Sequence, residues 1–314
     1  MQKEKKMAEY KSDLLIMGSG PAGYTAGIYA ARAGVNSLIV SGANKGGQLI
    51  RSSWVENFPG FVEPISGFDL MERIYKQAVN LGVKLIDDEI TEVDFYDNPF
   101  VCSSAGGNSF MSKSIIIATG ASVKWLGLPS EQKYIGHGVS SCATCDGFFY
   151  RGKEVAVIGG GNSALEQALY LTNYVEKVYI IHRRHSFNAE KIMQQRIFEN
   201  RKITIFWNNV VDEIIGTEDP MEVNGIRIRN VKSDKRKYLD IAGIFVSIGH
   251  HPNTEMFRRY LHLDAGGYIV TKAHSCATDI AGVFAAGDVC TPYRQAIIAA
   301  GCGAKAALEA IHYL

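Results

Sequence analysis

The sequence has no long apolar run and no excess of charge of either sign. Its 314 residues hold 33 Lys and Arg against 32 Asp and Glu, so the chain as a whole has no charge excess that would attract nucleic acid or an anionic membrane. No apolar run approaches the roughly 18 residues that span a bilayer. The charged start is followed only by Leu14–Met17 before glycine, which is too short for a secretory signal. We therefore expect a cytoplasmic protein that binds neither nucleic acid nor membrane.

Closely spaced cysteines are also scarce. Of the six cysteines, only Cys142 and Cys145 stand close together, in the sequence Cys-Ala-Thr-Cys. Without a secretory signal, an even number of cysteines does not indicate a disulfide framework. A structural zinc site would need a second pair or suitably spaced histidines. We expect no metal site, and we expect the other four cysteines to be buried as small apolar residues.

Glycine, by contrast, is abundant. It provides 32 residues, about a tenth of the chain, against a typical share of about 7%. Such a number indicates tight turns and places where the backbone approaches a ligand closely. The length allows two domains with hydrophobic cores, at about 150 residues per domain.

Two segments repeat one order of strand, glycine turn, helix and strand. In the first, strand 14–17 leads through Gly18, Ser19, Gly20, Pro21, Ala22 and Gly23 into helix 24–33 and strand 38–40. In the second, strand 154–158 leads through Gly159, Gly160, Gly161, Asn162, Ser163 and Ala164 into helix 165–171 and strand 177–181. The repeat predicts an α/β fold with two Rossmann-like dinucleotide-binding domains.

The remaining pattern predicts that the second domain is inserted into the first. A late strand at 282–286 and a helix at 296–314 have no strong partner motif of their own, so we expect them to complete the first domain. This gives a discontinuous first dinucleotide-binding domain, 1–120 and 251–314, and a second one, 121–250, that carries the Cys-x-x-Cys pair. The other expected elements are helix 68–80 and strands 90–95, 100–103, 114–117, 203–207, 210–215, 225–230 and 241–248.

Each glycine turn is suited to a dinucleotide pyrophosphate. Its first glycine makes the tight turn, the second admits the pyrophosphate, and the helix that follows directs N–H groups at it. The acid that commonly binds a ribose hydroxyl after the second strand is absent from the first motif, where Ser41 stands. After the corresponding strand of the second motif stand His182, Arg183 and Arg184, and two guanidinium groups there favour the 2′-phosphate of NADPH.

The cysteine pair completes a chain of redox groups. Two different dinucleotides on one chain indicate a flavin reduced by a nicotinamide, with FAD in the first domain. Asp288 would accept hydrogen bonds from the ribityl hydroxyls of FAD. Its alternative role is that of a structural cap. The pKa of a thiol in a Cys-x-x-Cys pair is lowered by its neighbours, so that it can attack a disulfide. Asp146, which follows Cys145, can move the proton.

In these motifs the chain resembles the low-molecular-weight thioredoxin reductases of the pyridine nucleotide–disulfide oxidoreductase superfamily, from Ser12 to its end. The resemblance rests on both glycine turns, the Cys142–Gly147 motif, His182–Arg184, and the four segments Gly46–Leu49, Glu56–Gly60, Ala118–Gly120 and Gly287–Asp288, the last followed by Tyr293–Ala296.

The resemblance implies the cofactors, the site residues and the partner. NADPH is held by Gly159–Ser163 and His182–Arg184. Cys145 faces the flavin, Cys142 attacks thioredoxin, Asp146 is the acid–base group, and the protein is a homodimer. FAD is held by the first glycine turn together with Val40, Ser41, Gly46, Gly47, Gln48, Asn57, Gly120, Asp288, Arg294, Gln295 and Ala296.

Two residues depart from the family pattern. Asn162 stands where the family commonly has Asp, and Asn188 stands where it commonly has Arg. The missing Arg reduces the expected preference for NADPH over NADH.

Two other functions remain possible at this point. One is a flavin dithiol oxidase that passes electrons to oxygen; the second glycine turn and Arg183 and Arg184 count against it. Another is a sensing module whose cysteines form a regulatory switch or zinc clip.

Overall fold

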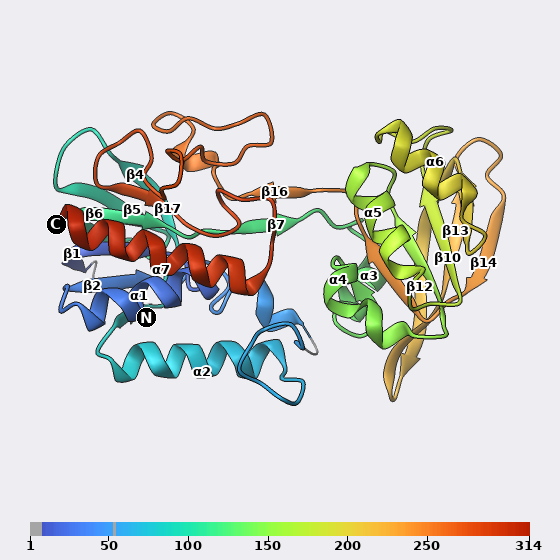
Figure 1. Ribbon diagram of the computed structural model, residues 1–314, viewed down its shortest axis with the longest axis horizontal. Coiled ribbons are helices and arrows are strands. Elements are labelled where there is room, and N and C mark those ends of the chain that lie inside the picture. Colours follow the sequence, from blue (N-terminus) through green and yellow to red (C-terminus); the bar gives the residue numbers. More distant parts are fainter. Residues whose placement is uncertain (1–7, 53–54) are drawn as a thin grey trace, which may run out of the picture. The chain divides into compact units, whose positions relative to one another are not determined.

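The structure is a computed structural model that describes residues 8–52 and 55–314. The described chain forms two compact units (Figure 1). The first contains the segments up to Ser52, Phe58–Ser122 and His251–Leu314, and the second contains Val123–His250 with residues 55–57. Two short strands, β7 (Ala121–Val123) and β16 (His250–Pro252), connect the units and pair with each other.

The first unit is built on a seven-stranded sheet in the order β3-β2-β1-β6-β5-β4, with β17 also paired to β6. The strands β1, β2, β3, β6 and β17 run parallel, and β4 and β5 extend the sheet antiparallel. The bounds are β1 Glu9–Met17, β2 Ser37–Val40, β3 Lys84–Ile86, β4 Ile90–Asp94, β5 Phe100–Ser104, β6 Ser109–Ile117 and β17 Val283–Ala285.

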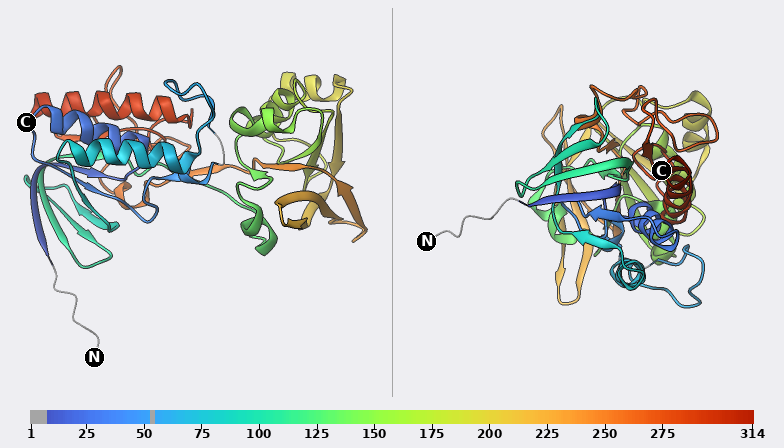
Figure 2. Two further views of the ribbon diagram at one scale, coloured as in Figure 1. Left: turned by 90° about the horizontal axis from the view of Figure 1, so that it is seen from below. Right: turned by 90° about the vertical axis from the view of Figure 1, so that its left-hand side faces the viewer.

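Helices α1 (Pro21–Arg32), α2 (Gly67–Asn80) and α7 (Ala296–Tyr313) lie side by side on one face of this sheet (Figures 1 and 2). Small residues let α1 and α7 approach closely, because a Cβ on Gly303 would come within 2.1 Å of the Ala22 carbonyl oxygen. Leu14 and Ile16 of β1 face this helical layer, and Leu15 and Met17 face a second core. The short helices η1 (Gln48–Arg51) and η3 (Glu255–Phe257) complete the unit.

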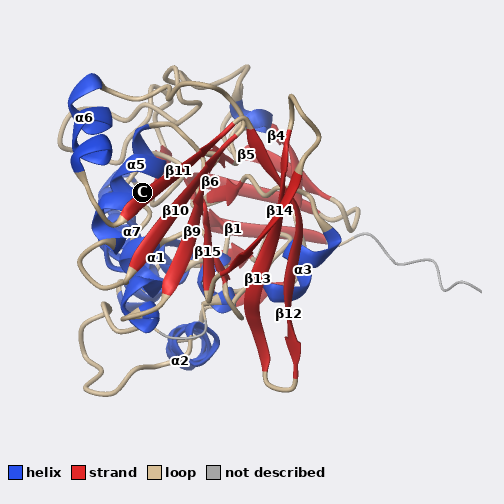
Figure 3. Ribbon diagram, turned by 90° about the vertical axis from the view of Figure 1, so that its right-hand side faces the viewer, coloured by secondary structure: helices blue, strands red, loops and turns tan. Residues whose placement is uncertain are grey.

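The second unit has a parallel five-stranded sheet in the order β11-β10-β9-β15-β8 and a three-stranded antiparallel sheet β12-β13-β14 (Figure 3). The strands are β8 Val139–Ser140, β9 Glu154–Ile158, β10 Lys177–His182, β11 Ile203–Trp207, β12 Asn209–Glu218, β13 Met221–Asn230, β14 Arg236–Asp240 and β15 Gly243–Val246. The helices are α3 Pro129–Tyr134, α4 Ala143–Asp146, η2 Gly147–Tyr150, α5 Asn162–Leu171 and α6 Lys191–Glu199.

The predicted fold class is confirmed, and the late strand and helix do return to the first unit. Several strands were not predicted or were predicted too short, and the polar ones show one reason. Strand β1 begins at Glu9, not Leu14, because its polar first half pairs with Ser109–Ser112 of β6. Strand β14 was not predicted, because most of its side chains are exposed and its order comes from pairing with β13. The strand expected at 241–248 is confined to β15.

Candidate functional site

The first glycine turn joins β1 to α1, and its three glycines have different surroundings. Gly18 has φ +113°, and a Cβ there would lie 2.2 Å from the Ala118 carbonyl oxygen. A Cβ on Gly23 would lie 1.9 Å from the Gly18 carbonyl oxygen. A Cβ on Gly20 would meet nothing within 4 Å. The first and third glycines are therefore required by packing, whereas Gly20 borders open space at the start of the helix, where a pyrophosphate fits.

Ser19 ties this turn to the loop after β2. Its buried hydroxyl donates to the Ser41 carbonyl oxygen at 2.8 Å and accepts from the Gly46 N–H at 3.0 Å. Gly47 has φ +71°, and a Cβ there would lie 3.0 Å from the Gly20 Cα atom. The structure thus brings Ser19, Ser41, Gly46 and Gly47 together around the turn. Two predicted residues, Val40 and Ala22, have side chains in the core and contribute through backbone and packing.

Asp288 lies just after β17, beside the start of α1. A Cβ on the preceding Gly287 would lie 3.0 Å from Ala22 Cβ. Among the described residues, none donates a hydrogen bond to the buried Asp288 Oδ1. Burial raises the pKa of Asp288 to about 6, and the Arg294 charge opposes the shift. A buried acceptor without a protein donor, next to an open glycine turn, fits a cofactor rich in hydroxyl groups, as FAD is.

The other residues predicted to bind FAD occupy loops and helix starts. Gln48 begins η1, Gln295 immediately precedes α7, and Ala296 is the first residue of that helix. Arg294 has φ +43°, and Gly120 has φ +69°. Asn57 is exposed and groups with the second unit, so the first unit does not bring it beside the other residues.

The second glycine turn repeats these surroundings between β9 and α5. Gly159 has φ +150°, and a Cβ there would lie 2.3 Å from the Ser247 carbonyl oxygen. A Cβ on Gly160 would lie 2.3 Å from the His182 ring. The nearest atom to a Cβ on Gly161 is the Asn188 carbonyl oxygen, at 3.8 Å. Gly161 therefore borders open space at the start of α5, as Gly20 does at the start of α1.

The side chain of His182 has a different place from those of Arg183 and Arg184. It is buried beneath Gly160, and its Nε2 lies 2.9 Å from the Ser186 carbonyl oxygen. Burial lowers the pKa of His182, and the nearby Arg184 and Arg183 charges lower it further, so the ring is a neutral support for the loop. Arg183 and Arg184 are exposed beyond the end of β10.

The two departures from the family pattern have structural partners here. Asn162 Oδ1 accepts from the Glu190 N–H at 2.8 Å, and its Nδ2 donates to Glu190 Oε1 at 3.4 Å. A carboxylate at position 162 could not make the second bond and would repel Glu190. The Asn188 N–H donates to the Gly160 carbonyl oxygen at 2.8 Å. The side chain of Asn162 and the backbone of Asn188 therefore hold the loop after β10 against the glycine turn, and the Asn188 contact would be the same with arginine at this position.

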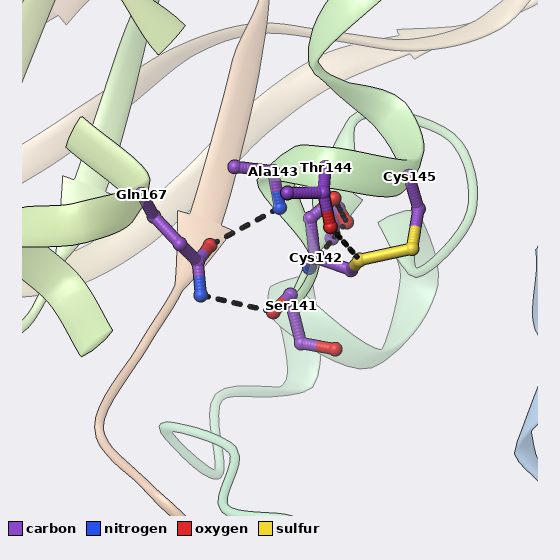
Figure 4. Close-up of a disulfide and its surroundings, with 7 residues drawn as sticks. Ser141, Cys142, Ala143, Thr144, Cys145 and Gln167 are labelled. Carbon is purple, nitrogen blue, oxygen red and sulfur yellow. Dashed lines mark hydrogen bonds between the residues drawn. A yellow bond between two sulfur atoms is a disulfide. The ribbon is translucent and has the colours of Figure 1, made fainter. Parts of the chain in front are cut away.

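Cys142 and Cys145 form a disulfide at the start of α4, with their Cα atoms 5.3 Å apart (Figure 4). Cys142 is the N-terminal cap of this helix. Gln167 of α5 holds the loop, because it accepts from the Ala143 N–H at 3.2 Å and donates to the Ser141 carbonyl oxygen at 3.3 Å. Gln167 was not predicted, and no local pattern marks a residue that acts 24 positions away.

Asp146, the last residue of α4, is the acid next to the disulfide. Burial raises its pKa, and a hydrogen bond with Ser140 opposes the shift. Asp146 therefore keeps its proton to a higher pH than an ordinary aspartate. The helix start and this acid suit a pair of sulfur atoms that exchange with another disulfide.

Within residues 8–52 and 55–314, no group of three or more His, Cys, Asp or Glu side chains could hold a metal ion. The helices of the same residues include none that is long and apolar enough to cross a membrane.

Comparisons with known proteins agree with this geometry. Residues 12–303 match the family described as pyridine nucleotide-disulphide oxidoreductase. The chain is 51% identical to a thioredoxin reductase of Rickettsia conorii over 302 residues, which cover 96% of this chain and 97% of that protein. It is 49% identical to a thioredoxin reductase of Escherichia coli O157:H7 over 312 residues, 96% of each chain.

Solved structures show the same likeness. A thioredoxin reductase from Streptococcus pyogenes superposes with a TM-score of 0.91 at 38% identity, over 96% of this chain and 98% of that one. One from Giardia duodenalis gives 0.90 at 38% identity, over 97% and 99%. The chain is therefore an enzyme of the pyridine nucleotide-disulphide oxidoreductase family and belongs to its thioredoxin reductases.

Proposed function

We propose that this enzyme uses NADPH to reduce the disulfide of thioredoxin, through FAD bound in the first unit and the Cys142–Cys145 pair in the second. The observation that carries the proposal is the disulfide at the start of α4, in the same unit as a glycine turn followed by two exposed arginines. Because the chain belongs to the thioredoxin reductases, we expect these groups to act in one reaction.

The two cofactors have separate sets of residues. FAD would lie along Gly18–Gly23, with the loop 40–48 on its course, and Asp288 would accept from a hydroxyl group of the cofactor. NADPH would lie along Gly159–Ser163, and Arg183 and Arg184 would bind its 2′-phosphate. When bound, FAD supplies the means to carry two electrons from the nicotinamide to the disulfide.

The chain's own residues perform the exchange with thioredoxin. In the reduced pair, the Cys142 thiolate attacks the thioredoxin disulfide, forms a mixed disulfide and releases one thioredoxin thiolate. The proton of Asp146 passes to that leaving thiolate. The Cys145 thiolate then attacks the Cys142 sulfur, which releases the second thioredoxin thiolate and restores the Cys142–Cys145 disulfide. Thioredoxin gains two electrons, and the pair loses two.

An anaerobic titration tests the proposal. NADPH should bleach the flavin absorbance of the purified protein, and oxidised thioredoxin should restore it. The Cys142→Ser variant should still bleach but should not recover, whereas Cys302→Ser, which removes a half-buried thiol of α7, should behave as wild type. Bleaching without recovery in the wild type would mean a different acceptor. No bleaching would point to a dithiol oxidase or a sensing module, and the proposal would be wrong.

Two further expectations stay predictions. The homodimer and the cytoplasmic location follow from the family resemblance and from the sequence, and sedimentation of the purified enzyme would check the first.

A further inference from the structure

The ribose contact of the first dinucleotide site lacks the usual acid. In Rossmann-like domains, an Asp or Glu after the second strand commonly binds a ribose hydroxyl. Here that strand is β2, and Ser41 follows it, with a side chain that is 2% exposed. A buried serine hydroxyl has a single hydrogen to donate and no negative charge.

The neighbouring strand end provides a carboxylate at this position. Strand β3 pairs with β2 in parallel, with Ile86 opposite Val40, so the residues after both strands lie at the same edge of the sheet. The Ser41 N–H donates to the Ile86 carbonyl oxygen at 3.0 Å. Asp87, the next residue, has its Oδ1 3.2 Å from the Ser41 hydroxyl oxygen.

Asp87 differs from the two acids that follow it. The Asp88 carboxylate accepts from Ser104, from Asn108 and from the Gly106 N–H, so it stabilises the loops around it. Glu89 is exposed. Asp87 is also exposed, but of the three acids it is the one whose carboxylate accepts from Ser41, the residue at the ribose position.

The Asp87 carboxylate can accept further hydrogen bonds besides the one from Ser41. The Ser41 hydroxyl also lies 3.1 Å from the Gly42 carbonyl oxygen and 3.3 Å from that of Asp88, and its single hydrogen serves one acceptor at a time. An ionised carboxylate has about four acceptor positions. Asp87 can therefore accept from a ribose as well.

We propose that Asp87 accepts a hydrogen bond from a ribose hydroxyl in the adenosine half of FAD, in place of the acid that Ser41 replaces. The inference rests on the proposed function, which puts FAD in the first unit. The negative charge would also repel a 2′-phosphate, so this unit would take a dinucleotide with an unmodified ribose.

The test compares Asp87→Ala with Glu89→Ala, which removes the same charge two residues away. The full chain, freed of flavin, is titrated with FAD and with an FAD analogue whose adenosine ribose lacks its 2′- and 3′-hydroxyls, and flavin fluorescence reports binding. Asp87→Ala should bind FAD about tenfold to a hundredfold more weakly than wild type, as expected for a hydrogen bond to a charged group. It should bind the analogue as wild type does, and Glu89→Ala should match wild type with both ligands.

Three results would overturn the inference. One is unchanged FAD affinity in Asp87→Ala. Another is an equal loss of affinity for FAD and the analogue, or a lower melting temperature of the flavin-free variant, since either would mean a structural role. A wild-type chain that binds no FAD would overturn the proposed function and this inference together, whereas the first two results leave FAD binding by the wild type intact.

Discussion

At the scale of single residues, the proposed function depends on two partly buried carboxyl groups. Burial raises the pKa of both Asp146 and Asp288. Asp146 lies beside the disulfide, and Asp288 has an oxygen with no donor among the described residues. Each can be examined separately, because the proposed function places Asp146 in the exchange step and Asp288 in cofactor binding.

Replacing Asp146 with Asn should slow reduction of thioredoxin by about a hundredfold, a usual contribution of a positioned acid or base. An amide of the same shape cannot give up the proton that the leaving thiolate needs. Stopped-flow measurement should show normal bleaching of the flavin by NADPH and slow recovery with thioredoxin. Glu166→Gln, an exposed acid of α5, is the control. Equal recovery rates in wild type and Asp146→Asn would contradict the acid–base role.

Asp288 should make the stability of the flavin-free chain depend on pH. Its pKa is about 6 in the folded chain, against an ordinary value of 3.8. The folded chain therefore holds this proton more tightly, and stability falls as pH rises through this interval. The loss is at most about 3 kcal/mol, since one pKa unit corresponds to about 1.4 kcal/mol.

The Asp288→Asn variant cannot ionise and should not show this loss. Urea unfolding of the flavin-free protein should give similar stability for variant and wild type near pH 4, and a more stable variant at about pH 7. Asp279→Asn, which changes an exposed acid nearby in sequence, should follow wild type. A difference between Asp288→Asn and wild type that is the same at both pH values would mean that burial of the charge is not its cause.

At the scale of elements, each strand–turn–helix motif contains two kinds of glycine. Packing requires glycine at some positions, and at one position the glycine borders open space. Gly18 and Gly23 in the first unit would clash with backbone if they carried a Cβ, and Gly160 in the second would clash with the His182 ring. Gly20 and Gly161 would not. Glycines of the same sequence motif therefore have two distinct physical roles.

This difference predicts opposite results for two neighbouring substitutions. Gly160→Ala should destabilise the protein by about 1–3 kcal/mol, as overpacked sites usually do, because the His182 ring must move. Gly161→Ala should leave the unfolding midpoint unchanged and weaken NADPH binding about tenfold, because its methyl group occupies the space at the start of α5. Thermal unfolding and NADPH titration measure the two effects. Weak NADPH binding with a clearly lowered melting temperature in Gly161→Ala would contradict the prediction.

At the scale of the whole molecule, the proposed function divides the redox groups between two units joined by two strands. The Asn253 side chain donates to the Thr119 carbonyl oxygen and accepts from Ser122, which joins both connections at one end. At the other end, buried Glu131 accepts from the Leu126 and Gly127 N–H groups. The segments between these anchors, near 123–125 and 248–251, are where we expect the chain to bend.

In the proposed function, nicotinamide and Cys145 both have to reach one flavin, so we expect the units to rotate during turnover. A cross-linker that ties one residue of the first unit to one of the second should abolish thioredoxin reduction. Cleaving a reducible version of the linker, followed by removal of the reductant, should restore it. Unchanged turnover in fully cross-linked protein would show that no rotation is needed.

The sequence by itself determined the features that depend on local spacing. Three kinds of feature lie within short segments, namely the two glycine turns, the Cys142–Cys145 pair and the arginines after β10. The order of strands and helices around them specifies the fold class. The late strand at 282–286 was recognisable because its glycines and apolar residues are also contiguous. Polar strands such as β14 were not, because their order comes from pairing with another strand and not from their own residues.

Only the tertiary structure decided which residues support these motifs. Gln167 holds the cysteine loop from 24 positions away, Asp87 reaches Ser41 across 46 positions, and the ring of His182 fills the space beneath Gly160. No periodicity of the chain encodes such contacts, since they arise when parallel strands bring the ends of distant segments to one edge of a sheet. The position of Asp87 beside Ser41, from which we infer its contact with the ribose, follows from this same geometry.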